Sequence, residues 1–176
     1  MKYAILNIVK KTGGGRLMRI VIFSDTHGNY AAMHKIIKRN GDADLFVFLG
    51  DGLSEFKKLK AHYIDCKMIA VKGNCDFDPD LPDHMVYELP NGKRMFLAHG
   101  DKWSVRTSVD AIYEKARELD CQFAFFGHTH VRYYEQRGNI LILNPGSAGQ
   151  PRDDKPACYA WLEITSTGII YNHVNL

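Results

Sequence analysis

Seven side chains with oxygen or nitrogen donor atoms each follow an apolar run of the sequence, and glycines adjoin nearly every one of them. They lie in the stretches SDTHGN, LGDG, KGNCD, AHGD and GHTH and are Asp25, His27, Asp51, Asn74, His99, His128 and His130. Carboxylate, amide and imidazole donors without a thiolate favour Mn, Fe, Zn, Ni or Co over a structural zinc site. Two divalent ions need about eight protein donor bonds, which seven residues supply if one carboxylate bridges the pair.

Each motif is weak by itself. In the stretch FFGHTHV, His128 and His130 are one residue apart, so in an extended segment both imidazoles point to the same side. Yet a lone His-x-His also occurs in polar loops, and Gly-Asp and Gly-Asn are ordinary turn sequences. The metal interpretation therefore depends on the whole series and on its position after predicted strands.

The intervening sequence alternates between strand and helix patterns. Residues 19–23, 44–51 and 67–74 read as buried strands separated by amphipathic helices, the first of which Asn29 is placed to cap. A hairpin with its turn at Asn91 and Gly92, one more helix at residues 108–119, a buried strand at 122–128 and four short strands follow. We predict an α/β domain with a mixed, two-sheet β core and helices on its outer faces.

The predicted strands explain how distant residues meet. Ligands of open α/β sheets bind outside the carboxyl ends of the strands, so five strand ends deliver the seven donors to one edge. Glycines next to these donors allow tight turns and close backbone approach. They are Gly28, Gly50, Gly52, Gly73, Gly100 and Gly127.

Composition limits the classes of protein that fit. A chain of 176 residues with 45% hydrophobic residues suits one domain, and its net charge of +3, with scattered Lys and Arg, argues against a dedicated nucleic-acid surface. No apolar run approaches the ~20 residues of a membrane helix. The four cysteines form no Cys-x-x-Cys pair, which favours reduced thiols and a cytoplasmic location.

The first seventeen residues differ from the rest. Residues 3–9 are rich in β-branched and aromatic side chains and precede three glycines, which suggests a strand and a flexible turn. Met18 directly precedes the first strong strand. We therefore expect residues 1–17 to be an extension, with Met18 as the natural start, and residues 18–176 to form a single domain.

The ordered motifs DTH, GD, GN, HG and GHTH resemble those of the calcineurin-like metallophosphoesterase superfamily. The stretches GNCD and NPGS are similar to those of its YfcE-type phosphodiesterase branch, and the resemblance extends from Arg19 to the C-terminus. It implies a four-layer α/β/β/α sandwich with mixed sheets and a binuclear centre at one rim. It further implies hydrolysis of a small phosphodiester by attack of a metal-bridging hydroxide.

The resemblance also assigns roles to residues. One ion takes Asp25, His27, Asp51 and His130, and the other takes Asp51, Asn74, His99 and His128, so that Asp51 bridges two divalent ions, with Mn favoured. Catalytic roles fall to Asp51, Asn74 and His99. Asn74 also contacts substrate, as does Arg152, because a guanidinium suits bidentate recognition of phosphate.

One position departs from the family pattern. Many members have a histidine after the asparagine, where it can protonate the leaving group, but this chain has Cys75 followed by Asp76. A thiol with an ordinary pKa of about 8.5 is a poor general acid beside imidazole. Cys75 is equally well read as a small packing residue, and Asp76 as a group that hydrogen-bonds a ligand or positions a water.

Two other functions compete with the phosphodiesterase. The retromer subunit with a similar Gly-Asn-x-Asp motif is a protein-binding scaffold with an incomplete metal site, whereas all seven ligands are present here. A nuclease would need a basic groove or an added DNA-binding domain, and the sequence has no sign of either. The natural substrate and a homo-oligomeric state are left open.

Overall fold

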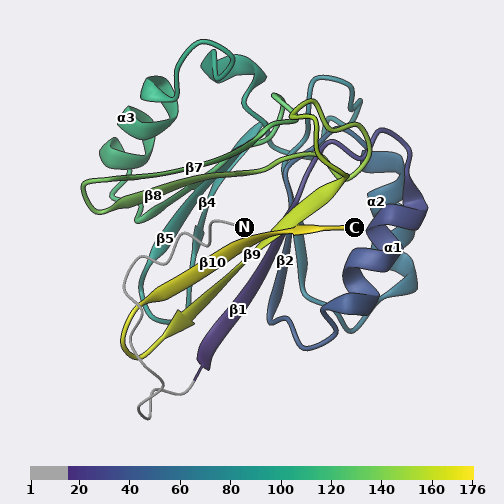
Figure 1. Ribbon diagram of the computed structural model, residues 1–176, viewed down its shortest axis with the longest axis horizontal. Helices are drawn as coiled ribbons and strands as arrows, with labels where there is room; N and C mark the ends of the chain where they lie inside the picture. Colours follow the sequence, from purple (N-terminus) through teal and green to yellow (C-terminus); the bar gives the residue numbers. More distant parts are fainter. Residues whose placement is uncertain (1–15) are drawn as a thin grey trace.

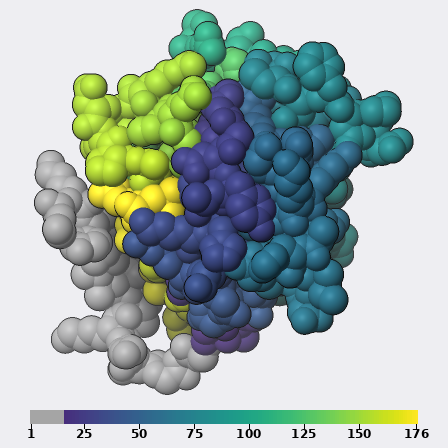
Figure 2. Space-filling model, turned by 90° about the vertical axis from the view of Figure 1, so that its right-hand side faces the viewer, coloured from purple at the N-terminus to yellow at the C-terminus, as the bar shows by residue number. Residues whose placement is uncertain are grey.

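The computed structural model describes residues 16–176. The first sheet has the strand order β10-β9-β1-β2-β3, in which β1, β2 and β3 are parallel while β9 and β10 are antiparallel to their neighbours. Its strands are β1 (Arg16–Phe23), β2 (Leu45–Phe48), β3 (Met68–Ala70), β9 (Cys158–Thr165) and β10 (Ile169–Asn175). The crossover helices α1 (Tyr30–Arg39) and α2 (Leu53–His62) cover its outer face, which Figure 2 shows in blue shades.

The second sheet has the order β4-β5-β6-β8-β7. Its strands are β4 (His84–Glu88), β5 (Arg94–Ala98), β6 (Phe123–Phe125), β7 (Arg132–Arg137) and β8 (Ile140–Pro145). Helix α3 (Asp110–Glu118) packs on its outer face, and a short 3-10 helix, Asp101–Trp103, was not predicted. The predicted four-layer α/β/β/α sandwich with mixed sheets is therefore confirmed (Figure 1).

Alternation along the strands builds the layers, because successive side chains of a strand point to opposite faces. In β1, Ile20 and Ile22 join the core between the two sheets, while Val21 and Phe23 pack against α1 and α2. In β5, Phe96 turns instead toward the cluster that includes α3. Both sheets are thus covered on both faces, which matches the continuous apolar runs of their central strands.

Local sequence signals act as predicted. The Asn29 side chain accepts a hydrogen bond of 3.0 Å from the Ala32 N–H and so caps α1. In the hairpin between β4 and β5, Gly92 has φ +78°, and the Asn91 side chain accepts from the Lys93 N–H at 3.1 Å. A left-handed residue in this turn is the reason that glycine suits the position.

The strand order brings the predicted ligand loops together. Three loops follow the adjacent parallel strands β1, β2 and β3, and two follow β5 and β6, which are also adjacent and parallel. All five leave the sheets at the upper edge in Figure 1, on both sides of the seam between the sheets. The arrangement is the one that a site shared by both sheets requires.

The structure describes only part of the N-terminal segment for which the sequence made predictions. Strand β1 begins at Arg16, whose Nη1 lies 2.6 Å from Asp42 Oδ2, so the strand starts two residues before Met18. The strand expected at residues 3–9 and the glycine turn after it lie outside the described residues, and the start at Met18 stays a prediction. Within residues 16–176, no helix combines the length and apolar character that crossing a membrane requires.

Candidate metal centre

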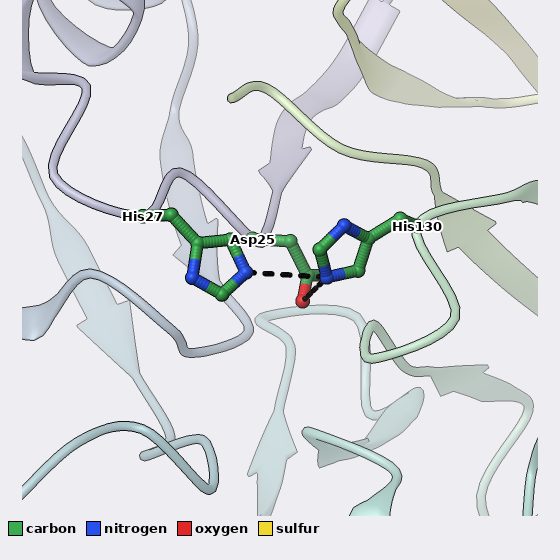
Figure 3. Close-up of side chains that lie close together, drawn as sticks. All are labelled: Asp25, His27 and His130. Atoms are coloured by element: carbon green, nitrogen blue, oxygen red, sulfur yellow. Dashed lines mark hydrogen bonds and ion pairs between the residues drawn. The ribbon is translucent and has the colours of Figure 1, made fainter. Parts of the chain in front are cut away.

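Asp25, His27 and His130 form one group of potential ligands. His130 Nε2 lies 3.1 Å from Asp25 Oδ1 and 3.2 Å from His27 Nε2. Figure 3 shows the Asp25 carboxylate between the two imidazoles, which come from the loops after β1 and β6. Three donor atoms directed at one point, from two different sheets, are what a single divalent ion needs.

A second group shares Asp25 with Asp51 and His99. His99 Nε2 lies 3.5 Å from Asp51 Oδ2 and 4.0 Å from Asp25 Oδ1, and one potential ligand atom from each of the three residues lies within 4.8 Å of the others. Asp51 Oδ2 is also 3.8 Å from His27 Nε2, so it contacts both groups. Asp25 is the residue common to both groups, so the bridging role implied for Asp51 stays a prediction.

The remaining predicted ligands lie at the edge of these groups. The ring of His128 meets that of His99 edge to face, with 5.2 Å between the centroids. Asn74 is exposed, and its amide nitrogen lies 3.3 Å from Cys75 Sγ. The Cys75 thiol groups with His27 and Asp51 as a further possible ligand.

Backbone carbonyls orient two of the imidazoles. The Nδ1 atoms of His99 and His130 lie 2.7 Å and 2.6 Å from the carbonyl oxygens of Leu49 and Gln150. A ring that donates its Nδ1 proton to a carbonyl presents the lone pair of Nε2, which is the atom facing the centre. Once the ring is neutral, such contacts leave Nε2 as the ligand atom.

Two atoms of the centre have unmet bonding capacity. Asp25 Oδ1 and His99 Nε2 are fully buried and have no hydrogen-bond partner within the described residues. Buried polar atoms are normally satisfied, and an unsatisfied one is expensive to keep. Both atoms point into the cluster of carboxylates and imidazoles, so the donor set fits a divalent cation.

The charges of the centre shift its pKa values. Burial alone would raise the pKa of Asp51, but His99 and the Cys75 N–H, which donates to Asp51 Oδ1 at 2.8 Å, lower it well below its usual range. Burial opposes protonation of His99, yet the Asp51 and Asp25 carboxylates raise its pKa to about 9. His99 must therefore lose a proton before its Nε2 can act as a ligand.

Strained backbone marks the same residues. Of eight non-glycine residues with positive φ in the described chain, five are predicted ligands. Left-handed conformations are uncommon outside glycine and tend to cluster at functional sites, where the surroundings enforce them. The five are Asp25 (53°), His27 (44°), Asp51 (60°), His128 (66°) and His130 (61°).

Asp76 fixes two of the ligand loops. One carboxylate oxygen accepts the backbone N–H groups of Asp51 and Gly73 at 2.7 Å and 2.9 Å, and the other accepts those of Gly52 and Leu53, both at 2.9 Å. Leu53 begins α2, so the carboxylate also compensates the unpaired N–H groups of a helix terminus. Asp76 therefore positions Asp51 instead of binding a ligand or a water.

The segment after β8 supports the other side of the centre. The Ser147 hydroxyl donates to the Asp25 carbonyl at 2.7 Å, and the Gln150 carbonyl holds His130 as described above. A Cβ on Gly149 would lie 2.2 Å from the Thr26 carbonyl oxygen, so only glycine permits this approach. Residues 147–150 thus position two ligands, a role that the turn chemistry of the NPGS sequence alone did not indicate.

Arg152 and Cys75 stand beside the centre. The Arg152 N–H donates to the His130 carbonyl at 3.0 Å, while its side chain is exposed and lines a neighbouring cavity. Partial desolvation, together with the nearby carboxylates of Asp51 and Asp76, raises the pKa of Cys75 to about 11. The thiol is therefore a weaker acid than its ordinary pKa implied.

The sequence also matches a known family model. The description of that model is the calcineurin-like phosphoesterase superfamily domain, and the match covers residues 18–167. The chain belongs to this superfamily. Members of this superfamily use divalent metals, which agrees with the groups of potential ligands in this chain.

Named relatives agree with this assignment. A probable metallophosphoesterase of Bacillus subtilis, YsnB, is 30% identical over 148 residues, covering 84% of this chain and 85% of the relative. The phosphodiesterase YfcE of Escherichia coli is 27% identical over 179 residues, with 88% and 92% covered.

Solved structures confirm the metallophosphoesterase fold. The crystal structure of a predicted phosphoesterase of Streptococcus pneumoniae has a TM-score of 0.79 and 28% identity, and the alignment covers 90% of this chain and 89% of that one. Vps29 of Entamoeba histolytica, crystallised with zinc, has a TM-score of 0.67 at 20% identity, with 89% and 98% covered. The second likeness concerns the fold alone.

Substitution of Asp76 tests whether its carboxylate holds the Asp51 loop in place. We expect Asp76→Asn to lower the free energy of unfolding by about 2–3 kcal/mol, since an amide accepts through one oxygen where the carboxylate accepts through two. Mn²⁺ affinity should fall by about 10–100-fold, the usual effect of disturbing a group that orients ligands. Urea unfolding of chelator-treated protein and calorimetric titration measure the two effects.

Asp80→Asn is the matched control. Asp80 is exposed, its side chain accepts no hydrogen bond within residues 16–176, and the substitution changes the same chemical group. Equal stability and equal Mn²⁺ affinity in the two variants would show that Asp76 does not hold the Asp51 loop.

Proposed function

We propose that the protein is a cytoplasmic phosphodiesterase that binds two divalent ions, with Mn²⁺ favoured, and hydrolyses small phosphodiesters. The observation that carries the proposal is the convergence of Asp25, His27, Asp51, His99 and His130 at the seam of the sheets. Support also comes from the relative at 27% identity that is named a phosphodiesterase. Residues 18–176 would act as a single domain.

The ligands would divide into two sets that share Asp51. Asp25, His27 and His130 complete one set, and Asn74, His99 and His128 complete the other. When bound, two such ions lower the pKa of water to supply a nucleophile near neutral pH and neutralise charge on the phosphoryl oxygens.

The residues of the chain prepare the site for this chemistry. Asp51 stays ionised because His99 lowers its pKa. In the metal-free protein, burial and the positive charges of protonated His99 and of Arg106 lower the pKa of His128, which keeps the ring of His128 neutral and able to act as a ligand. Asn74 is a neutral group at the exposed rim, so it can contact a phosphoryl oxygen without repelling it.

A scaffold function remains the alternative. Vps29 shares the fold, but at 20% sequence identity a shared fold does not imply a shared function. The complete set of seven potential ligands favours the enzyme. The three measurements below separate the two, because a scaffold has no turnover that depends on the metal or on the ligands.

Removal of metal is the first test of the proposal. Exhaustive chelation, verified by elemental analysis, should abolish hydrolysis of bis(p-nitrophenyl) phosphate, and Mn²⁺ should restore it, because the donors are otherwise uncompensated. Circular dichroism before and after chelation controls for loss of fold. Full activity in verified metal-free protein would overturn metal dependence.

Substitution of Asp51 should reduce activity and metal binding more than substitution of Asn74. We expect Asp51→Asn to lower kcat/KM by about 10²-fold or more and to reduce the bound metal below two ions per chain, since one carboxylate supplies charge to both sites. Asn74→Ala should be milder, and Asp80→Asn serves as the control for loss of a carboxylate. Near-normal turnover with two ions bound in Asp51→Asn would contradict the bridging assignment.

The protonated Cys75 leads to a prediction about leaving groups. General acid help is typically worth about 10²–10⁴-fold, and a thiol with a pKa of about 11 supplies little of it. We expect kcat to fall steeply as leaving-group pKa rises across a series of substituted phenyl diesters. Cys75→His should raise turnover mainly for the poorest leaving groups.

Cys75→Ser is the control, because it changes the same side chain without adding an imidazole. A flat series in the parent protein, with chemistry shown to be rate-limiting, would mean that another acid already protonates the leaving group.

A further inference from the structure

A cavity of about 670 Å³ adjoins the candidate metal centre on the side of the second sheet. Thr129, which lies between the ligands His128 and His130, forms part of its wall. We call this cavity the arginine pocket and define it by six of its lining residues: Arg106, Thr107, Ser108, Phe126, Thr129 and Arg152. It is distinct from the ligand cluster but opens beside it.

The arginine pocket has uncompensated positive charge. Neither Arg106 nor Arg152 has an ion pair or a side-chain hydrogen bond within residues 16–176, and both side chains are exposed. Arg137 also lines the cavity, but Asp110 and Glu135 bind it at 2.7 Å and 2.8 Å. No Asp or Glu belongs to the lining, so two guanidinium groups are left to meet an anion.

Both arginines are tied to the metal centre. The Arg152 backbone is hydrogen-bonded to the carbonyl of His130, which places this residue at the ligand loop itself. Arg106 lines the same cavity as Thr129, the residue between the ligands His128 and His130. An adjoining group of a molecule whose phosphorus sits at the metals would therefore have this cavity, with both guanidinium groups, beside it.

The rest of the lining suits an organic anion. Thr107, Ser108 and Thr129 bring hydroxyl groups, while Phe126 is buried and forms an apolar wall. Guanidinium groups recognise carboxylate and phosphate through paired hydrogen bonds. Mixed apolar walls with a few polar groups are typical of small-molecule sites.

A second cavity contains part of the metal centre itself, because the ligands His27 and Asp51 line it. It measures about 510 Å³, and Asp51, Glu55 and Asp76 contribute to its wall. Its lysine, Lys57, is paired with Asp78. This cavity thus offers an anionic arm no unpaired lysine or arginine, whereas the arginine pocket offers two, so the two cavities are electrostatically unequal.

From this asymmetry we infer that the arginine pocket binds one ester arm of the phosphodiester substrate and selects an arm that carries a second negative charge, a carboxylate or a further phosphate. The inference rests on the proposed function, because the phosphodiester must be held at the metal centre. It assigns Arg106 as a specificity-determining residue and extends the role expected of Arg152 from the scissile phosphate to the arm beyond it.

Four p-nitrophenyl phosphodiesters with the same scissile bond test the inference. Their second arms are ethyl, 2-carboxyethyl, 2-phosphonooxyethyl and choline, which differ in charge. In the Mn²⁺-loaded protein we expect kcat/KM for an anionic arm to exceed that for ethyl by about tenfold, the scale of one charge-assisted hydrogen bond. The choline ester should be the poorest, and the two anionic arms show whether carboxylate or phosphate fits better.

Variants then assign the preference to the two arginines. The readout is the ratio of kcat/KM for anionic and ethyl esters, because a general effect on the metal centre cancels in it. In the double variant Arg106→Gln with Arg152→Gln, the ratio should fall to within about twofold of one. Arg106→Lys with Arg152→Lys should keep part of it. Arg39→Gln, at the end of α1 away from the ligand loops, should keep all of it.

The outcomes separate the two levels of the proposal. If the Mn²⁺-loaded protein cleaves none of the four esters, the phosphodiesterase function is overturned and the inference with it. If the ethyl ester is cleaved but the parent protein has no preference for anionic arms, or the double glutamine variant keeps that preference, the phosphodiesterase stands and the role of the arginine pocket is wrong.

Discussion

Two buried carboxylates, Asp25 and Asp51, govern the structure, with potential ligand atoms within 4.8 Å of each other. Like charges this close disfavour each other's ionisation unless a cation compensates them. In the described part of the chain, the cationic groups within 4 Å of these carboxylates are histidines, and no lysine or arginine is among them. The fold thus maintains a concentrated negative site that external cations can neutralise.

The surrounding structure holds this unfavourable arrangement in place. Left-handed backbone disfavours L-residues by roughly 1–2 kcal/mol each, and five ligands adopt it. The compensation comes from outside the ligand set, through the Asp76 carboxylate and the Ser147 hydroxyl, which bond the backbone of the Asp51 and Asp25 loops. The apolar layers on both faces of each sheet supply the stability that such strain requires.

Much of this architecture is readable from the sequence, because its signals are local or periodic. The cap at Asn29, the turn at Gly92 and the strand alternation each act within a few residues. The seven donors and a two-sheet core with outer helices also followed from the residues, and the resemblance to a known family added the division of the donors between two ions. The sequence did not indicate the left-handed ligands, since backbone strain is enforced by tertiary contacts that no short pattern encodes.

Long-range partners explain the remaining differences. The oxygens of Asp76 were free to bind a ligand or a water by sequence, but backbone donors up to 25 residues away take them up. The sequence does not indicate which arginines keep an uncompensated charge. In the arginine pocket, Asp110 and Glu135 pair with Arg137, whereas Arg106 has no such partner within residues 16–176. Pairing of charges across elements is decided by packing, which leaves no mark on composition.

The position of the centre at the seam of the sheets has a consequence for assembly. The His128 N–H binds Asp25 Oδ2 across 103 positions of the chain, and neither sheet alone carries a full ligand set. Small zinc domains use their ion to nucleate folding. Here the site does not exist until both halves have docked, so a growing chain on the ribosome presents only scattered ligands. We therefore expect a divalent ion to bind after the two sheets have docked, so that its binding would report a complete fold.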